Sequence, residues 1–80
     1  TQPFVMSVSA EVPASHQSSA RYETHFMREM IDHHHMAVIM AEACLTKAVH
    51  EPLLTMCASI QMEQQMEIAT LQSWLTEWYG

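Results

Sequence analysis

The stretch that decides the fold runs from Tyr22 to Cys44 and reads YETHFMREMIDHHHMAVIMAEAC. Residues at steps of four and three form one stripe along an amphipathic helix that packs on another helix. The stripe consists of Tyr22, Phe26, Met30, His33, Ala37, Met40 and Cys44. Ser18 or Ser19 is a suitable N-cap. We therefore predict a long helix over about residues 19–48.

A second stripe with the same spacing follows a short connection. It consists of Leu53, Cys57, Ile60, Gln64, Ile68, Leu71, Leu75 and Trp78. Pro52 suits the first turn of a new helix, so we predict a helix over residues 52–79. A connection of a few residues makes the two helices antiparallel neighbours. The chain thus divides into a flexible N-terminal arm or linker, residues 1–17, and a Met/His-rich helical hairpin, residues 18–80.

The two stripes fix a register for the hairpin. In an antiparallel pair, residues at one level have numbers with a constant sum, and the stripes match at a sum near 101. This register pairs Cys44 with Cys57 and His34 with Glu67. The cysteines can form a disulfide in an oxidising compartment, remain free and buried, or bind Cu(I) as thiols, and the sequence leaves these alternatives open.

Two helices do not enclose a core, because each buries one stripe against the other. Apolar side chains also lie away from the predicted seam, at Val38, Ile39 and Leu45 and at Met62, Met66 and Ala69. We therefore predict an all-α fold, a long antiparallel hairpin that forms half of a ferritin-like four-helix bundle. Dimerisation, or a second hairpin in a longer parent chain, would complete the bundle.

The composition limits the partners of this chain of 80 residues. Lys and Arg number 3 against 9 Asp and Glu, which argues against nucleic acid and against anionic membrane surfaces. No apolar run is long enough to span a bilayer. Because the chain begins at Thr1 without Met or an apolar leader, we expect it to be a processed or trimmed product. The unusual feature is the number of side chains that carry sulfur or an imidazole ring: 8 Met, 6 His and 2 Cys.

These side chains form two trios on the first helix. The first trio, Met27, Met30 and His34, and the second trio, His33, Met36 and Met40, are each spaced by three and four residues. Thioether sulfur is a soft neutral ligand that favours Cu(I) or Ag(I), and imidazole adds affinity for copper. We therefore expect a copper site, with Cu(I) as the ion, on these six residues.

Two other interpretations remain open at this stage. Methionine at helical spacing is often flexible core filler, and the histidines can be satisfied by carboxylates, His34 by Glu67 and His33 by Glu29. The hairpin would then be a structural or interaction module without a metal. An enzyme is not expected, because no Glu precedes a His by three residues, as a di-iron site requires, and no HExxH motif is present.

Ordered motifs in both helices resemble a known family. The first helix carries Phe26-Met27-x-x-Met30-Ile31-x-His33-His34-x-x-Ala37-Val38-x-Met40-Ala41, and the second carries Gln64-x-x-Glu67-Ile68, Trp74-Leu75 and Trp78-Tyr79-Gly80. They resemble a ferritin-like family labelled as a domain of unknown function, which includes the periplasmic copper-binding protein CopM. The resemblance implies a helical bundle, a periplasmic or secreted location, and copper binding by Met and His.

Overall fold

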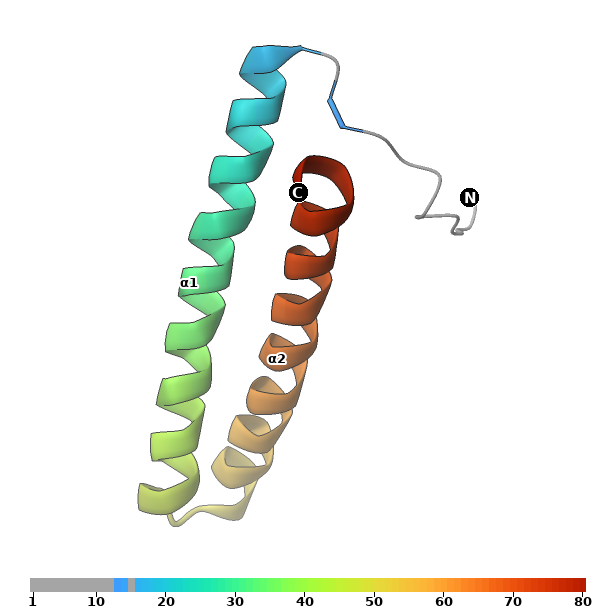
Figure 1. Cartoon of the computed structure of the whole chain (residues 1–80). Helices are drawn as coiled ribbons and strands as arrows, with labels where there is room; N and C mark the ends of the chain where they lie inside the picture. The colour runs from blue at the N-terminus through green and yellow to red at the C-terminus, as the bar shows by residue number, and fades with distance from the viewer. Residues whose placement is uncertain (1–12, 15) are drawn as a thin grey trace.

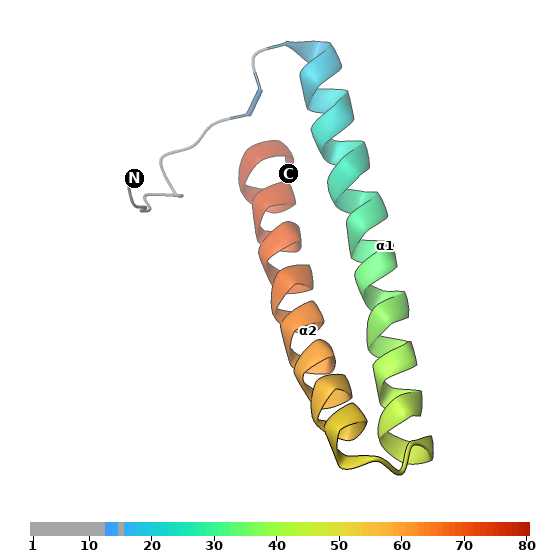
Figure 2. The same ribbon diagram turned by 180° about the vertical axis from the view of Figure 1, so that it is seen from behind.

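The computed structural model describes residues 13, 14 and 16–80, which form two long helices, α1 (Gln17–Lys47) and α2 (Glu51–Tyr79). The helices lie side by side in both views, with the start of α1 beside the end of α2 (Figures 1 and 2). This arrangement confirms the antiparallel hairpin. Each helix end falls within two residues of its predicted position. Most of the predicted arm, residues 1–17, lies outside the described residues.

The start of α1 differs from the prediction. His16, rather than Ser18 or Ser19, occupies the N-cap position, with an extended backbone and a carbonyl that accepts the Ala20 N–H at 2.9 Å. The His16 side chain makes no capping hydrogen bond. The physical reason lies in the preceding residues, because the Ala14 N–H donates to the Tyr79 hydroxyl at 3.0 Å. This tertiary contact holds the chain just before His16 and overrides the local preference for a serine cap.

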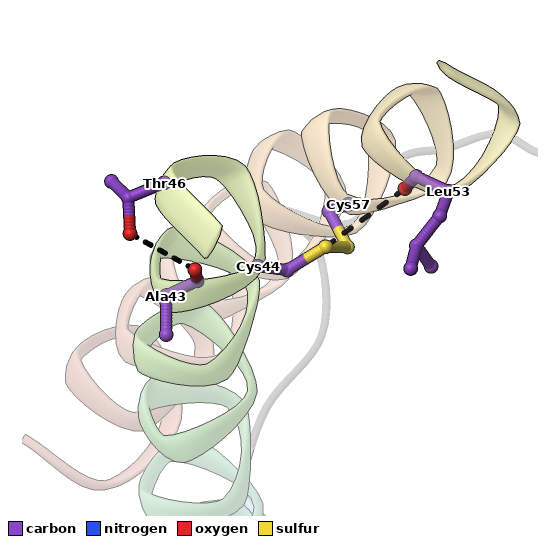
Figure 3. The surroundings of a disulfide bond; sticks show 5 residues. All are labelled: Ala43, Cys44, Thr46, Leu53 and Cys57. Atoms are coloured by element: carbon purple, nitrogen blue, oxygen red, sulfur yellow. Dashed lines mark hydrogen bonds between the residues drawn. A yellow bond between two sulfur atoms is a disulfide. The ribbon is translucent and has the colours of Figure 1, made fainter. Parts of the chain in front are cut away.

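The predicted register is confirmed at two levels. Cys44 and Cys57 form a disulfide near the connection Ala48–His50, with their Cα atoms 6.2 Å apart (Figure 3). Farther along the hairpin, His34 Nε2 lies 2.6 Å from Glu67 Oε1. We call the disulfide end of the hairpin the closed end, and the end that holds the start of α1 and the end of α2 the open end.

The face that α1 turns toward α2 differs from the predicted stripe. The buried residues of α1 are Met27, Val38 and Ala41, whereas Tyr22 and Met40, both assigned to the seam, are each 66% exposed. Val38 was expected off the seam, and this expectation is wrong. The cause is a broad apolar arc on α1, which contains two adjacent stripes with the same spacing. The small side chain of Ala41 lies on the buried one, where it permits close approach of the helices.

The seam of α2 agrees better with the sequence. Cys57 and Ile68 are buried, and five other stripe residues are half-buried: Ile60, Gln64, Leu71, Leu75 and Trp78. Leu53 is the exception, at 45% exposure. Apart from Leu53, the predicted stripe of α2 is therefore the face that packs against α1.

The rotation of α1 leaves an open groove along one side of the hairpin, bordered by the predicted α1 stripe. Three hollows lie along it. The closed-end hollow, of about 370 Å³, includes Met40, Cys44, Leu53, Cys57 and Ile60 in its lining. The middle hollow, of about 370 Å³, includes Phe26, Met30, His34, Glu67, Leu71 and Trp74. The open-end hollow, of about 170 Å³, includes Tyr22, Met27, Leu71, Trp74 and Trp78.

Aromatic side chains are concentrated toward the open end. Trp74 and Trp78 stack with ring centroids 5.3 Å apart, and Tyr22 stacks on Phe26 at 6.0 Å. The indole Nε1 of Trp78 is buried and has no hydrogen-bond partner among the described residues. Neither α1 nor α2, the helices of the described residues, has the length and apolar character needed to cross a membrane.

Reduction of the disulfide should destabilise the hairpin. The cross-link closes a loop with a sequence separation of 13, and restricting the unfolded chain over such a loop contributes about 3 kcal/mol. The free energy of unfolding, measured with urea, should fall by about this amount when a phosphine reductant is added. The double variant C44A/C57A is the control and should not respond to the reductant. An unchanged stability of the reduced parent would contradict the prediction.

The stability of the open end should depend on pH in the alkaline range. The Tyr79 hydroxyl donates to Glu23 Oε1 at 2.6 Å, and this hydrogen bond raises the pKa of the Tyr79 phenol. The folded chain therefore favours the protonated phenol. Its stabilising contribution is complete below the ordinary pKa of about 10 and is lost as the pH rises through the higher folded value.

Urea unfolding of the parent and of Tyr79→Phe at neutral and at alkaline pH measures this effect. Above pH of about 10, the parent should lose more stability than the variant, which has no proton to release. Equal losses in the two proteins would show that the hydrogen bond between Tyr79 and Glu23 does not contribute to the stability of the fold.

Candidate metal-binding site

The first trio lies where α1 faces α2. Met27 is buried, at 4% exposure, and Met30 and His34 are half-buried. Met30 and His34 line the middle hollow, and Met27 lines the adjoining open-end hollow. The sequence placed Met30 on the predicted stripe but not Met27 or His34, whereas the structure places all three along the seam. The two thioethers and the imidazole therefore border one continuous part of the groove.

A hydrogen bond to Glu67 fixes the orientation of the His34 ring. The His34 side chain is only 14% exposed, and its Nε2 lies 2.6 Å from Glu67 Oε1. The Glu67 side chain is 63% exposed, so the carboxylate remains hydrated. With Nε2 engaged by the carboxylate, Nδ1 is the ring nitrogen left for another ligand. A carboxylate in this position orients and strengthens histidine ligands in many metal sites.

The second trio is more open. Met36 is 57% exposed and Met40 is 66% exposed, and His33 is also exposed. Met40 lines the closed-end hollow beside the disulfide. The structure therefore gives the two trios different settings, the first in the seam between the helices and the second on the outer surface of α1 and the edge of the groove.

The exposure of the methionines bears on their role. Of the seven methionines among the described residues, only Met27 and Met30 are not exposed. The other five are between 57% and 66% exposed: Met36, Met40, Met56, Met62 and Met66. Packing in the core of the hairpin does not account for these five side chains. Their thioethers are accessible from solution, or to a partner that covers the surface.

Harder ligands do not gather in the part of the chain that the structure describes. Within residues 13, 14 and 16–80, no three His, Cys, Asp or Glu side chains are arranged to hold a metal ion. Both trios instead combine imidazole with thioether sulfur. Such ligands suit Cu(I) and are unsuited to Mg²⁺ or Ca²⁺, which prefer oxygen.

Sequence reasoning did not identify the groove wall that faces the first trio. Thr70 and Trp74 of α2 line the middle hollow beside Met30 and His34. A signal was present, because Trp74 lies three residues after Leu71, which the register places opposite Met30, and so shares a face with it. The predicted stripe continued from Leu71 to Leu75 and Trp78 and omitted Trp74.

Comparison with protein families gives one match. The family described as "Domain of unknown function (DUF305)" matches residues 23–80, which include most of α1 and all of α2. The chain belongs to the DUF305 family. The match covers the motifs on which the resemblance rested, including both trios and the pair formed by His34 and Glu67. No curated protein and no solved structure matches the chain, so copper binding remains a prediction for this DUF305 domain.

Proposed function

We propose that this DUF305 hairpin is an exported copper-binding module that holds Cu(I), or Ag(I) in its place, for copper tolerance or homeostasis. The observation that carries the proposal is the position of the first trio. Met30 and His34 line one hollow, Met27 lines the next, and Glu67 holds the His34 ring by one nitrogen. This arrangement supplies two soft ligands and one oriented imidazole from a single helix.

The proposed chemistry follows from the charge and softness of the ligands. Met27 and Met30 would donate thioether sulfur, and His34 would donate Nδ1. None of the three ligands carries a charge when the ring is neutral, so the site retains the positive charge of Cu(I). The Glu67 carboxylate would offset that charge and hold the ring in place. An all-thioether and imidazole set favours Cu(I) over Zn²⁺, which is more often held by thiolate, imidazole and carboxylate.

The disulfide supports the proposed location. Disulfides persist in the periplasm and outside cells, whereas cytosolic thiols are generally kept reduced. The bond between Cys44 and Cys57 is thus consistent with an oxidising extracytoplasmic compartment. We assign the protein to the periplasm or to the secreted fraction on this ground, together with the resemblance of its motifs to exported copper-binding proteins.

We also propose that a second copy of the hairpin covers the groove and completes a four-helix bundle. The three hollows occupy one side from the closed end to the open end, so the occupant must be about as long as the hairpin itself. A second copy has this length, and its own groove needs the same cover. The groove lining is mainly apolar although the chain carries a formal charge of -6, so the faces can meet without strong repulsion.

Replacing Met27 and Met30 together by leucine should weaken Cu(I) binding. The substitutions nearly preserve the apolar volume, so the helices should still pack. Since loss of a group that merely orients a ligand lowers metal affinity by roughly 10- to 100-fold, loss of two ligands should lower it at least tenfold. Competition with a chromophoric Cu(I) chelator measures the affinity, anaerobically and with ascorbate, which keeps copper reduced and leaves the disulfide intact.

Met62→Leu is the matched control, because Met62 is exposed and belongs to neither trio. It should bind Cu(I) as the parent does. If the double variant folds and retains the parent affinity, the first trio is core packing. The second trio, His33, Met36 and Met40, would then be the candidate to test next.

Sedimentation should show a dimer at micromolar concentration, with about twice the chain mass of 9.2 kDa. Phe26→Glu places a charge in the groove and should shift the equilibrium to monomer. Phe26 is 43% exposed, so the substitution does not disrupt a buried position of the hairpin. Ile39→Glu is the control, since Ile39 is an exposed apolar residue outside the three hollows. A well-folded parent monomer would overturn this assignment.

A further inference from the structure

Three sulfur-containing side chains line the closed-end hollow. Met40 lies four residues before Cys44 on the same face of α1, and Cys57 of α2 lies level with Cys44. Figure 3 shows the disulfide bridging the two helices. The first trio does not contribute to this hollow. The copper chemistry proposed above therefore leaves this sulfur cluster without a role.

We propose that a thiol reductant converts the closed-end hollow into a second Cu(I) site, held by the thiolates of Cys44 and Cys57 and the thioether of Met40. In the disulfide form, neither cysteine sulfur is a strong ligand. In the reduced form, two anionic sulfurs and one neutral sulfur would converge from two helices. This inference does not depend on copper binding by the first trio.

The reaction balances with two monothiol molecules or one dithiol. Reduction breaks the bond between the Cys44 and Cys57 sulfurs, the reductant supplies two electrons and two protons, and it becomes a disulfide itself. Binding of Cu(I) then replaces the two thiol protons, which are released to solvent. Copper remains Cu(I) throughout. Two thiolates and one monovalent ion leave the site with a single negative charge.

Contacts other than the disulfide would keep the two thiolates close after reduction. The Cα atoms are 6.2 Å apart, and the three-residue connection Ala48–His50 joins the helices just beyond Cys44. Close to the disulfide, Gln61 Nε2 of α2 also donates a hydrogen bond to Glu42 Oε2 of α1 at 3.3 Å. The bond between His34 and Glu67 lies farther along the same seam. Both cysteines would therefore remain near one ion after the covalent bond is broken.

The site is accessible from the groove. Met40 is 66% exposed and Cys44 is half-buried, whereas Cys57 is 6% exposed and forms the floor. The Cys44 sulfur lies 3.9 Å from the Leu53 carbonyl oxygen, which offers an acceptor to the thiol proton once the disulfide is reduced. An incoming ion would thus meet the thioether first and the thiolates beneath it.

The remaining lining selects for a soft monovalent ion. The other residues of the hollow are Ala37, Ala41, Leu53 and Ile60, none of which carries a side-chain nitrogen or oxygen. Structural Zn²⁺ sites are almost always four-coordinate, and the side chains of this hollow offer three ligands. Cu(I) favours thiolate and thioether sulfur. The hollow is therefore assigned to Cu(I) over Zn²⁺.

The test compares Cu(I) binding by the full chain before and after reduction. The parent is titrated anaerobically against a chromophoric Cu(I) chelator, once with ascorbate alone and once after treatment with a dithiol reductant that is removed before copper is added. The reduced parent should bind one equivalent more than the oxidised parent, and this equivalent should add ultraviolet absorption from thiolate-to-Cu(I) charge transfer. The variant M27L/M30L should retain the additional equivalent, which separates this proposal from the first-trio site.

Two variants test the ligands. C44S/C57S should bind the same number of equivalents with and without prior reduction, because it lacks the two thiols. Met40→Leu should lower the affinity for the additional Cu(I) at least tenfold. Loss of a group that only orients a metal ligand already lowers metal affinity by roughly 10- to 100-fold. Met62→Leu should leave it unchanged.

Four results would overturn the proposal. The first is equal Cu(I) stoichiometry in the reduced parent and C44S/C57S. The second is an additional equivalent that does not respond to Met40→Leu. The third is Zn²⁺ binding at the closed end as tight as that of Cu(I). The fourth is a reduced parent whose helical circular dichroism is lost and is not restored by Cu(I), because the two helices would then no longer bring the thiolates together.

Discussion

The fixed register of the two helices determines which residues meet along the seam. A disulfide at the closed end and the hydrogen bond between His34 and Glu67 hold α1 and α2 at two separate levels. A shift of one helix along the other would break both contacts and move every pair along the seam. With the register set, the rotation of each helix about its own axis decides which side chains are buried in the seam and which border the groove. The candidate metal site and the groove both follow from that alignment.

The rotation of α1 links the fold to the proposed chemistry. Had the predicted stripe faced α2, Tyr22, Phe26 and Met40 would have packed against it and the first trio would have lain to one side. Instead Met27 and Ala41 are buried in the seam, and the predicted stripe borders the groove. The same rotation places His34 beside Glu67 and leaves Met40 exposed at the hollow that contains the disulfide. One rigid adjustment of a helix thus creates both candidate sites.

The sequence predicted the hairpin, its helix boundaries and its register because these depend on spacing, which is explicit in the chain. It did not predict which of two neighbouring stripes on α1 would face α2, since Phe26, His33 and Met40 repeat every seven residues, as do Met27, His34 and Ala41. The choice between them depends on close packing of small side chains, which single-chain periodicity does not encode. The choice of His16 as N-cap likewise depended on Tyr79, a residue at the far end of the chain.

The contacts of this hairpin grow steadily less local from one end to the other. The disulfide joins residues 13 apart, the pair His34 and Glu67 is 33 apart, and the bond from Ala14 to Tyr79 spans 65 residues. Closing a long segment costs more chain entropy than closing a short one, so the hairpin should zip from the connection outward. Fraying proceeds in the reverse direction and begins where the tryptophans stack. Met27 therefore lies in the portion that opens first, while His34 and the sulfur cluster stay within the portion that remains paired.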